Sequence, residues 1–153
     1  MAEQVLRHLP LANKTQRAAA LELAVRAMSA AGDAHGAQVH LQELRSVAQA
    51  VPTGPLPAAA SFCDGVVAAA AGDYESAAVA FEDAAALFAA SDAPYELGRA
   101  RTELARALAE LGRRDLARRE AAAALVLSRY STASWIKAGR LAPSLAASGR
   151  SWG

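Results

Sequence analysis

The chain has a single cysteine, Cys63, and few aromatic side chains, which make up 5% of its 153 residues. One cysteine cannot form an internal disulfide, and we interpret Cys63 as a buried, inert thiol because it stands in an apolar segment. Hydrophobic residues reach 54% of the composition, and many of them are alanine. This combination favours closely packed helices over a sheet, which needs larger or β-branched side chains, and it predicts an all-α fold.

Long hydrophobic runs are also missing. Every alanine-rich stretch is interrupted by a charge, a proline or a glycine before it reaches the roughly 20 apolar residues of a membrane span. The N-terminus lacks the charged and then apolar segment of a secretory leader. We therefore expect a cytoplasmic protein with no membrane partner, folded as one domain over residues 1–153.

The sequence contains no residue pattern typical of catalysis or metal binding. His35 and His40 are five residues apart and diverge by roughly 140° about a helix axis, so they do not converge on one metal ion. Neighbouring carboxylates such as Glu82 and Asp83 resemble a solvated helix surface, because general acid–base pairs face each other across a cleft. The prediction is a protein that is not an enzyme, with no catalytic residues, no metal and no cofactor.

The net charge of +1 conceals an uneven distribution. Residues 1–92 carry five Lys/Arg and ten Asp/Glu, whereas residues 93–153 carry eleven and five. This division indicates an acidic partner, nucleic acid, or complementarity between neighbouring parts of the chain, and a solvated arginine-rich helix surface would explain it as well. We do not expect direct nucleic-acid binding.

Apolar residues at spacings of three and four predict amphipathic helices that end at glycine or proline. The first predicted helix runs from about residue 13 or 15 to 31, and the others cover about 34–50, 58–71, 74–90, 94–111 and 114–129. Ser131 and Thr132 have the residue types of a helix start, so a seventh helix is expected at about 133–147, weakened at Pro143. This helix, which contains Trp135, is expected to cap the end of the helical array.

A repeat underlies these helices. Gly32, Gly72 and Gly112 are 40 residues apart. An alanine stands five residues after each of these glycines, at positions 37, 77 and 117. A fixed period with one helix-turn-helix per unit predicts a solenoid of stacked hairpins, an α-α superhelix. The predicted units are residues 13–51, 55–91 and 93–130, followed by the capping helix at 133–147.

The middle unit resembles a tetratricopeptide repeat. Six residues match this motif in order, and the first of them is the small residue of the unit's first helix: Gly65, Gly72, Tyr74, Ala77, Phe81 and Ala84. The flanking units lack the tyrosine and the phenylalanine, and the period exceeds the family's usual length of roughly 34 residues.

Residues 14–130 are similar in style to the helical-repeat region of the large LuxR-family, MalT-like transcriptional regulators. The similarity is carried by the stretch Phe81–Leu127, which includes Ala93-Pro94-Tyr95-Glu96. The resemblance implies a non-catalytic scaffold for protein–protein interaction, such as the sensor or oligomerisation segment of a regulator. The alternative is a small-molecule-binding regulatory domain that holds an inducer.

The family's binding groove lies on the concave face, which the first helix of each unit lines. Transferring its positions by their distance from each glycine implies seven binding residues: Glu22, Arg26, Phe62, Val66, Arg99, Thr102 and Arg106. An apolar middle with a basic end suits a peptide or protein partner that carries a hydrophobic anchor and a carboxylate. In the competing interpretation Phe62 belongs to the core and the arginines are solvated. If the cap is absent, the open end provides a surface for a homodimer.

Overall fold

The computed structural model describes residues 14–52 and 54–141, and the side chains of residues 16–52 and 54–129. This part of the chain is helical and contains no strand, which confirms the all-α prediction. Its helices are α2 (Lys14–Ala30), α3 (Ala34–Ala50), α4 (Leu56–Ala70), α5 (Tyr74–Ala90), α6 (Pro94–Glu110) and α7 (Arg114–Leu141).

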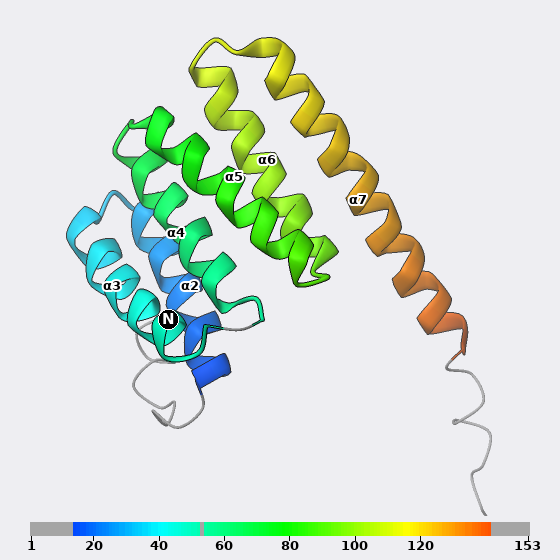
Figure 1. The fold of residues 1–153 in the computed structure, drawn as a ribbon, viewed down its shortest axis with the longest axis horizontal. Coiled ribbons are helices and arrows are strands. Elements are labelled where there is room, and N and C mark those ends of the chain that lie inside the picture. The colour runs from blue at the N-terminus through cyan, green and yellow to red at the C-terminus, as the bar shows by residue number, and fades with distance from the viewer. Residues whose placement is uncertain (1–13, 53, 142–153) are drawn as a thin grey trace, which may run out of the picture.

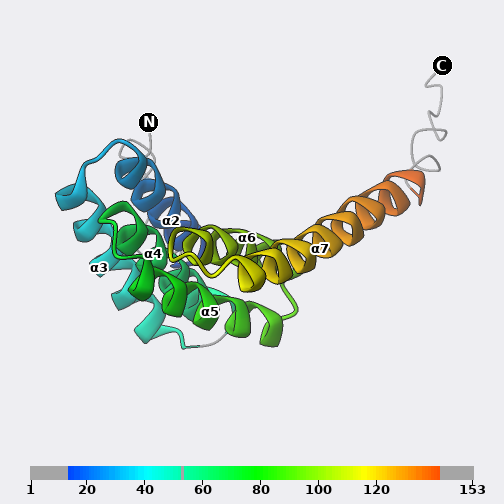
Figure 2. The same ribbon diagram turned by 90° about the horizontal axis from the view of Figure 1, so that it is seen from above.

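The helices form successive antiparallel hairpins, α2–α3, α4–α5 and α6–α7, that stack into a curved array (Figures 1 and 2). Helix α4 packs against both helices of the first hairpin, and α6 packs against α5 of the second. The predicted helical-repeat superhelix is therefore confirmed. None of the helices in the described residues is both long enough and apolar enough to cross a membrane.

The turns inside the three hairpins share one backbone geometry. Gly32, Gly72 and Gly112 have φ angles of +77°, +78° and +74°, in the left-handed region that glycine adopts without steric cost. The amide of the residue after each glycine donates to a carbonyl five positions earlier, for example from Asp73 to Ala68 at 3.0 Å. This arrangement is a Schellman motif, which ends the first helix. The 40-residue period of the sequence is therefore also a period of the backbone conformation at these turns.

Aspartates after two of these glycines start the next helix. The carboxylate of Asp33 accepts a hydrogen bond from the amide of Gly36 at 2.9 Å, and that of Asp73 accepts one from Ser76 at 3.1 Å. Such N-caps satisfy amides that have no partner within the helix. Helices α3 and α5 accordingly have the predicted bounds, whereas α4 begins at Leu56 rather than residue 58, because Pro57 is accommodated in its first turn.

The predicted break at Ser131 and Thr132 is wrong. Helix α7 continues without interruption from Arg114 to Leu141 and extends beyond the other helices (Figures 1 and 2). Serine and threonine permit a helix start but do not enforce one, and no proline or turn glycine stands near this point. Residues 133–141 therefore prolong α7 instead of starting a separate capping helix. Residues 142–147 of the predicted cap lie outside the described residues.

The core consists of two clusters at the junctions between hairpins. One surrounds Phe62, Phe81 and Phe88 and includes Leu104 and Leu108 from α6. The other lies between the first hairpin and α4, where Cys63 is fully buried, as expected for an inert thiol. A Cβ atom on Gly65 would lie 2.6 Å from the Phe81 ring, which explains the glycine at this small position.

Candidate functional site

Arg99 joins three of the predicted binding residues. Its guanidinium lies 2.7 Å from a carboxylate oxygen of Glu22 and 4.8 Å from the centre of the Phe62 ring. Glu22 and Arg99 are 18% and 25% exposed, so water screens this ion pair only partly. The contact links α2 of the first hairpin directly to α6 of the third, across α4. A cation–π contact of this kind adds about 0.5–2 kcal/mol of attraction.

Phe62 is covered rather than open. The ring is 3% exposed, and its other neighbour is Phe81, at a centroid distance of 5.5 Å and a tilt of 57°. Phe62 thus contributes mainly to the core at the junction between α4–α5 and α6, with Arg99 above it. The apolar middle of the concave face is formed largely by its smaller neighbours.

A hollow of about 410 Å³ lies beside this ring on the face that α2, α4 and α6 share. Its floor is apolar, and the charged groups in its wall are Arg26 from α2 and Glu103 from α6. The structure brings three predicted residues together here, Arg26, Phe62 and Val66. Sequence reasoning missed the rest of the lining, which is Ser29, Ala30, Ala69, Ala70 and Glu103.

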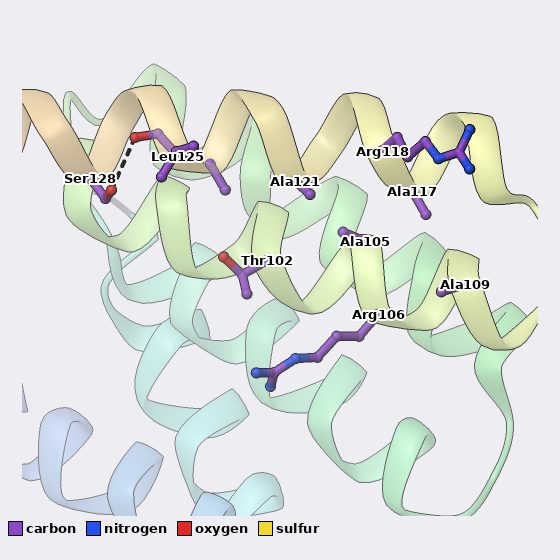
Figure 3. A pocket seen from close by; sticks show the side chains of 10 residues that line it. Thr102, Ala105, Arg106, Ala109, Ala117, Arg118, Ala121, Leu125 and Ser128 are labelled. Atoms are coloured by element: carbon purple, nitrogen blue, oxygen red, sulfur yellow. Dashed lines mark hydrogen bonds between the residues drawn. The ribbon is translucent and has the colours of Figure 1, made fainter.

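Thr102 and Arg106 line a different surface, a groove between α6 and α7 with a volume of about 560 Å³ (Figure 3). The hydroxyl of Thr102 donates to the carbonyl of Gly98 at 2.9 Å, and Arg106 pairs with Glu103 at 2.8 Å. Among the described residues, the groove is lined by Thr102, Ala105, Arg106, Ala109, Ala117, Arg118, Ala121, Ala124, Leu125 and Ser128. Of the seven predicted residues, three line the hollow, Thr102 and Arg106 line this groove, and Glu22 and Arg99 pair with each other.

Two adjacent titratable groups of α4, Cys63 and Asp64, have raised pKa values. Burial raises the pKa of Cys63, and the nearby carboxylates of Glu22 and Asp64 raise it further. Burial also raises the pKa of Asp64, although Arg45, whose guanidinium donates to it at 3.0 Å, opposes this shift. Cys63 thus remains a thiol, which is a poor nucleophile. Among the described residues, no group of three or more His, Cys, Asp and Glu side chains could hold a metal ion.

Part of the uneven charge is neutralised within the molecule. Arg99 pairs with Glu22, and Arg113 pairs with Glu75 at 2.6 Å, so two arginines of the basic half reach carboxylates of the acidic half. The Arg113–Glu75 pair is the complementarity between neighbouring units that the charge distribution left open, whereas the Arg99–Glu22 pair joins the first unit to the third. Arg106 and Arg118 pair with carboxylates of their own helices, and Arg101 of α6 pairs with Glu120 of α7 at 2.9 Å.

No family model matches the chain, and neither a curated protein nor a solved structure matches it.

Proposed function

We propose that this protein is a non-catalytic interaction scaffold that binds a peptide or protein partner on its concave face. The observation that carries the proposal is the hollow lined by α2, α4 and α6, the first helices of three successive hairpins. Its alanine and valine floor accepts an apolar side chain of the partner. Arg26 from α2 then pairs with a carboxylate of the partner, and Glu103 from α6 pairs with a cation of the partner. A partner segment with a hydrophobic anchor between a carboxylate and a cation is complementary to this surface.

The proposed role is regulatory. The tetratricopeptide-like pattern of the middle unit and the similarity to the helical region of LuxR-family, MalT-like regulators support a sensor or oligomerisation segment of a transcriptional regulator. In this role the scaffold transmits partner binding through the stacked hairpins, and the Glu22–Arg99 contact couples the first hairpin to the third.

A displayed library of random peptides, selected on the full chain, tests the proposal. We expect the selected peptides to carry an apolar anchor, and Ala70→Trp, which fills the hollow, to weaken their binding by about tenfold or more. Val79→Trp is the matched control, because Val79 is 58% exposed on α5, outside the hollow. Equal binding by both variants would place the peptide elsewhere and refute the concave site.

The volume of the hollow also supports a second candidate, a small-molecule inducer domain. About 410 Å³ lies within the range of ligand pockets, and the Ser29 hydroxyl in its wall has no hydrogen-bond partner among the described residues. A metabolite that raises the melting temperature of the full chain, but not that of Ala70→Trp, would favour this candidate over peptide binding.

A further inference from the structure

The groove between α6 and α7 repeats a surface that is filled elsewhere in the molecule. Subtracting 40 from each of its lining residues gives Phe62, Gly65, Val66, Ala69, Ala77, Ala78, Phe81, Ala84, Ala85 and Phe88. In the middle hairpin these residues are buried or half-buried, most of them in the cluster that α6 completes. A further step of 40 reaches Leu41, Leu44 and Ala48, which α4 covers. The groove is therefore the third member of a series in which the first two surfaces each receive a helix.

This third surface lacks the aromatic side chains of the second. The aromatic residues of the middle hairpin are replaced, with Thr102 in place of Phe62, Ala121 in place of Phe81 and Ser128 in place of Phe88. Its floor is mostly alanine, and Leu125 is 55% exposed there (Figure 3). A helix that fills this space must bring larger apolar side chains than the alanines and leucines that α6 presents to the middle hairpin.

The charges at the groove select an acidic occupant. Arg106 and Arg118 stand where the middle hairpin has Val66 and Ala78, and both extend away from the alanine floor (Figure 3). Their side chains are 71% and 79% exposed, and each pairs with a carboxylate three residues away on its own helix. Such exposed pairs contribute little to stability, so both arginines are available to carboxylates of another molecule.

A second copy of this chain fits the groove poorly. A second copy docked groove to groove would bring Arg106 and Arg118 of both molecules together and would face alanine with alanine. Like charges at such a contact oppose association.

We propose that the groove between α6 and α7 binds an acidic amphipathic helix of a partner protein. The distance from Ala117 to Ser128 along α7, about 17 Å, sets a minimum of about three helical turns. The helix presents bulky apolar residues to the alanine floor and carboxylates to Arg106 and Arg118. This site is separate from the concave hollow and does not depend on it.

Copies of α6 serve as probes, because α6 fills the equivalent surface of the middle hairpin. Two labelled peptides of residues 94–111 both carry Ala107→Phe, and their three arginines are changed to glutamate in one and to lysine in the other. Fluorescence anisotropy with the full chain measures their binding. We expect the glutamate peptide to bind at least about tenfold more tightly than the lysine peptide, and to lose affinity as salt rises.

Adjacent residues of α7 provide the matched control. Leu125 lines the groove and Val126 does not, although they are 55% and 53% exposed. We expect Leu125→Glu to lower the affinity for the glutamate peptide by about tenfold or more. Val126→Glu should change this affinity by less than about twofold. Arg106→Glu combined with Arg118→Glu should reverse the preference in favour of the lysine peptide, and melting curves of each variant verify that it is folded.

Three results would overturn the proposal. The first is failure of the full chain to bind either peptide, and the second is an equal effect of Leu125→Glu and Val126→Glu. The third is a dimer of the full chain in sedimentation that Leu125→Glu dissociates, which would assign the groove to a second copy. The comparison of Ala70→Trp with Val79→Trp tests the concave site alone, and the comparison of Leu125→Glu with Val126→Glu tests the groove alone. Failure of one proposal is therefore distinguishable from failure of the other.

Discussion

The middle hairpin, α4–α5, and the last one, α6–α7, have the same turn but different interiors. Gly72 and Gly112 have φ angles of +78° and +74°, and the same pattern of backbone hydrogen bonds follows each of them. The middle hairpin places Phe62, Phe81 and Phe88 where the last one has threonine, alanine and serine. The period therefore fixes the backbone, while the side chains decide which surface becomes core and which stays available for binding.

The two hairpins also differ in how facing positions share their volume. Gly65 faces the Phe81 ring, whereas the positions 40 residues later hold Ala105 and Ala121. A large ring needs a glycine opposite it, and an alanine tolerates an alanine. Facing residues thus vary together, so the effect of a substitution depends on the hairpin that receives it.

The largest expected effect comes from removing the central ring of the middle hairpin. Phe81 is 1% exposed and contacts both Phe62 and the backbone at Gly65, so Phe81→Ala should cost about 3–5 kcal/mol of unfolding free energy. Ala121→Phe makes the opposite change at the equivalent, exposed position and should cost less than about 1 kcal/mol. Urea denaturation measures both. Similar losses in the two hairpins would show that the α6–α7 groove is packed as tightly as the core.

Gly65→Ala should cost about 1–3 kcal/mol, because its Cβ atom would lie 2.6 Å from the buried Phe81 ring. In a background of Phe81→Ala the same change should cost much less, since the ring that opposes it is gone. A double-mutant cycle in urea measures this coupling. Additive effects would mean that the two positions do not share their volume.

Arg99→Ala should cost about 1–2 kcal/mol, because it removes a partly buried ion pair with Glu22 and the contact with the Phe62 ring. Arg113→Ala is the matched control, since Arg113 and Glu75 are 47% and 59% exposed, and its cost should stay below about 1 kcal/mol. Added salt should reduce the Arg113 effect more than the Arg99 effect. The reverse order in urea denaturation would contradict the bridging role of Arg99.

Sequence predicted the parts of the fold that local chemistry determines. Glycine at a left-handed turn, aspartate at a helix start and the spacing of small residues act within a few positions, so the period and the bounds of α3 and α5 were accessible. The break at Ser131 and Thr132 was wrong for the complementary reason. Those residues tolerate a helix interior, and nothing nearby forces the backbone to leave it.

The candidate site was less accessible, because it depends on contacts between distant segments. Arg99 and Arg106 are seven residues apart on one helix, yet one reaches Glu22 on α2 and the other pairs within its own helix. The contact between Arg99 and Glu22 joins residues that are 77 apart in sequence, so local patterns do not reveal it. The α6–α7 groove had a signal in the sequence, the small residues 40 positions after Phe62, Phe81 and Phe88, but its meaning required knowing which surfaces α4 and α6 fill.

The smallest expected effect concerns the turn between the second and third hairpins. Asp92 has a φ angle of +51°, and the amide of Ala93 donates to the carbonyl of Phe88 at 3.1 Å, the hydrogen bond that follows each turn glycine. A side chain costs free energy in this left-handed conformation, so Asp92→Gly should stabilise the protein by about 0.5–1 kcal/mol in urea denaturation. Gly72→Asp should destabilise it by a similar amount. If Asp92→Gly destabilises the protein instead, the turn between hairpins depends on its carboxylate and differs in kind from the turns inside them.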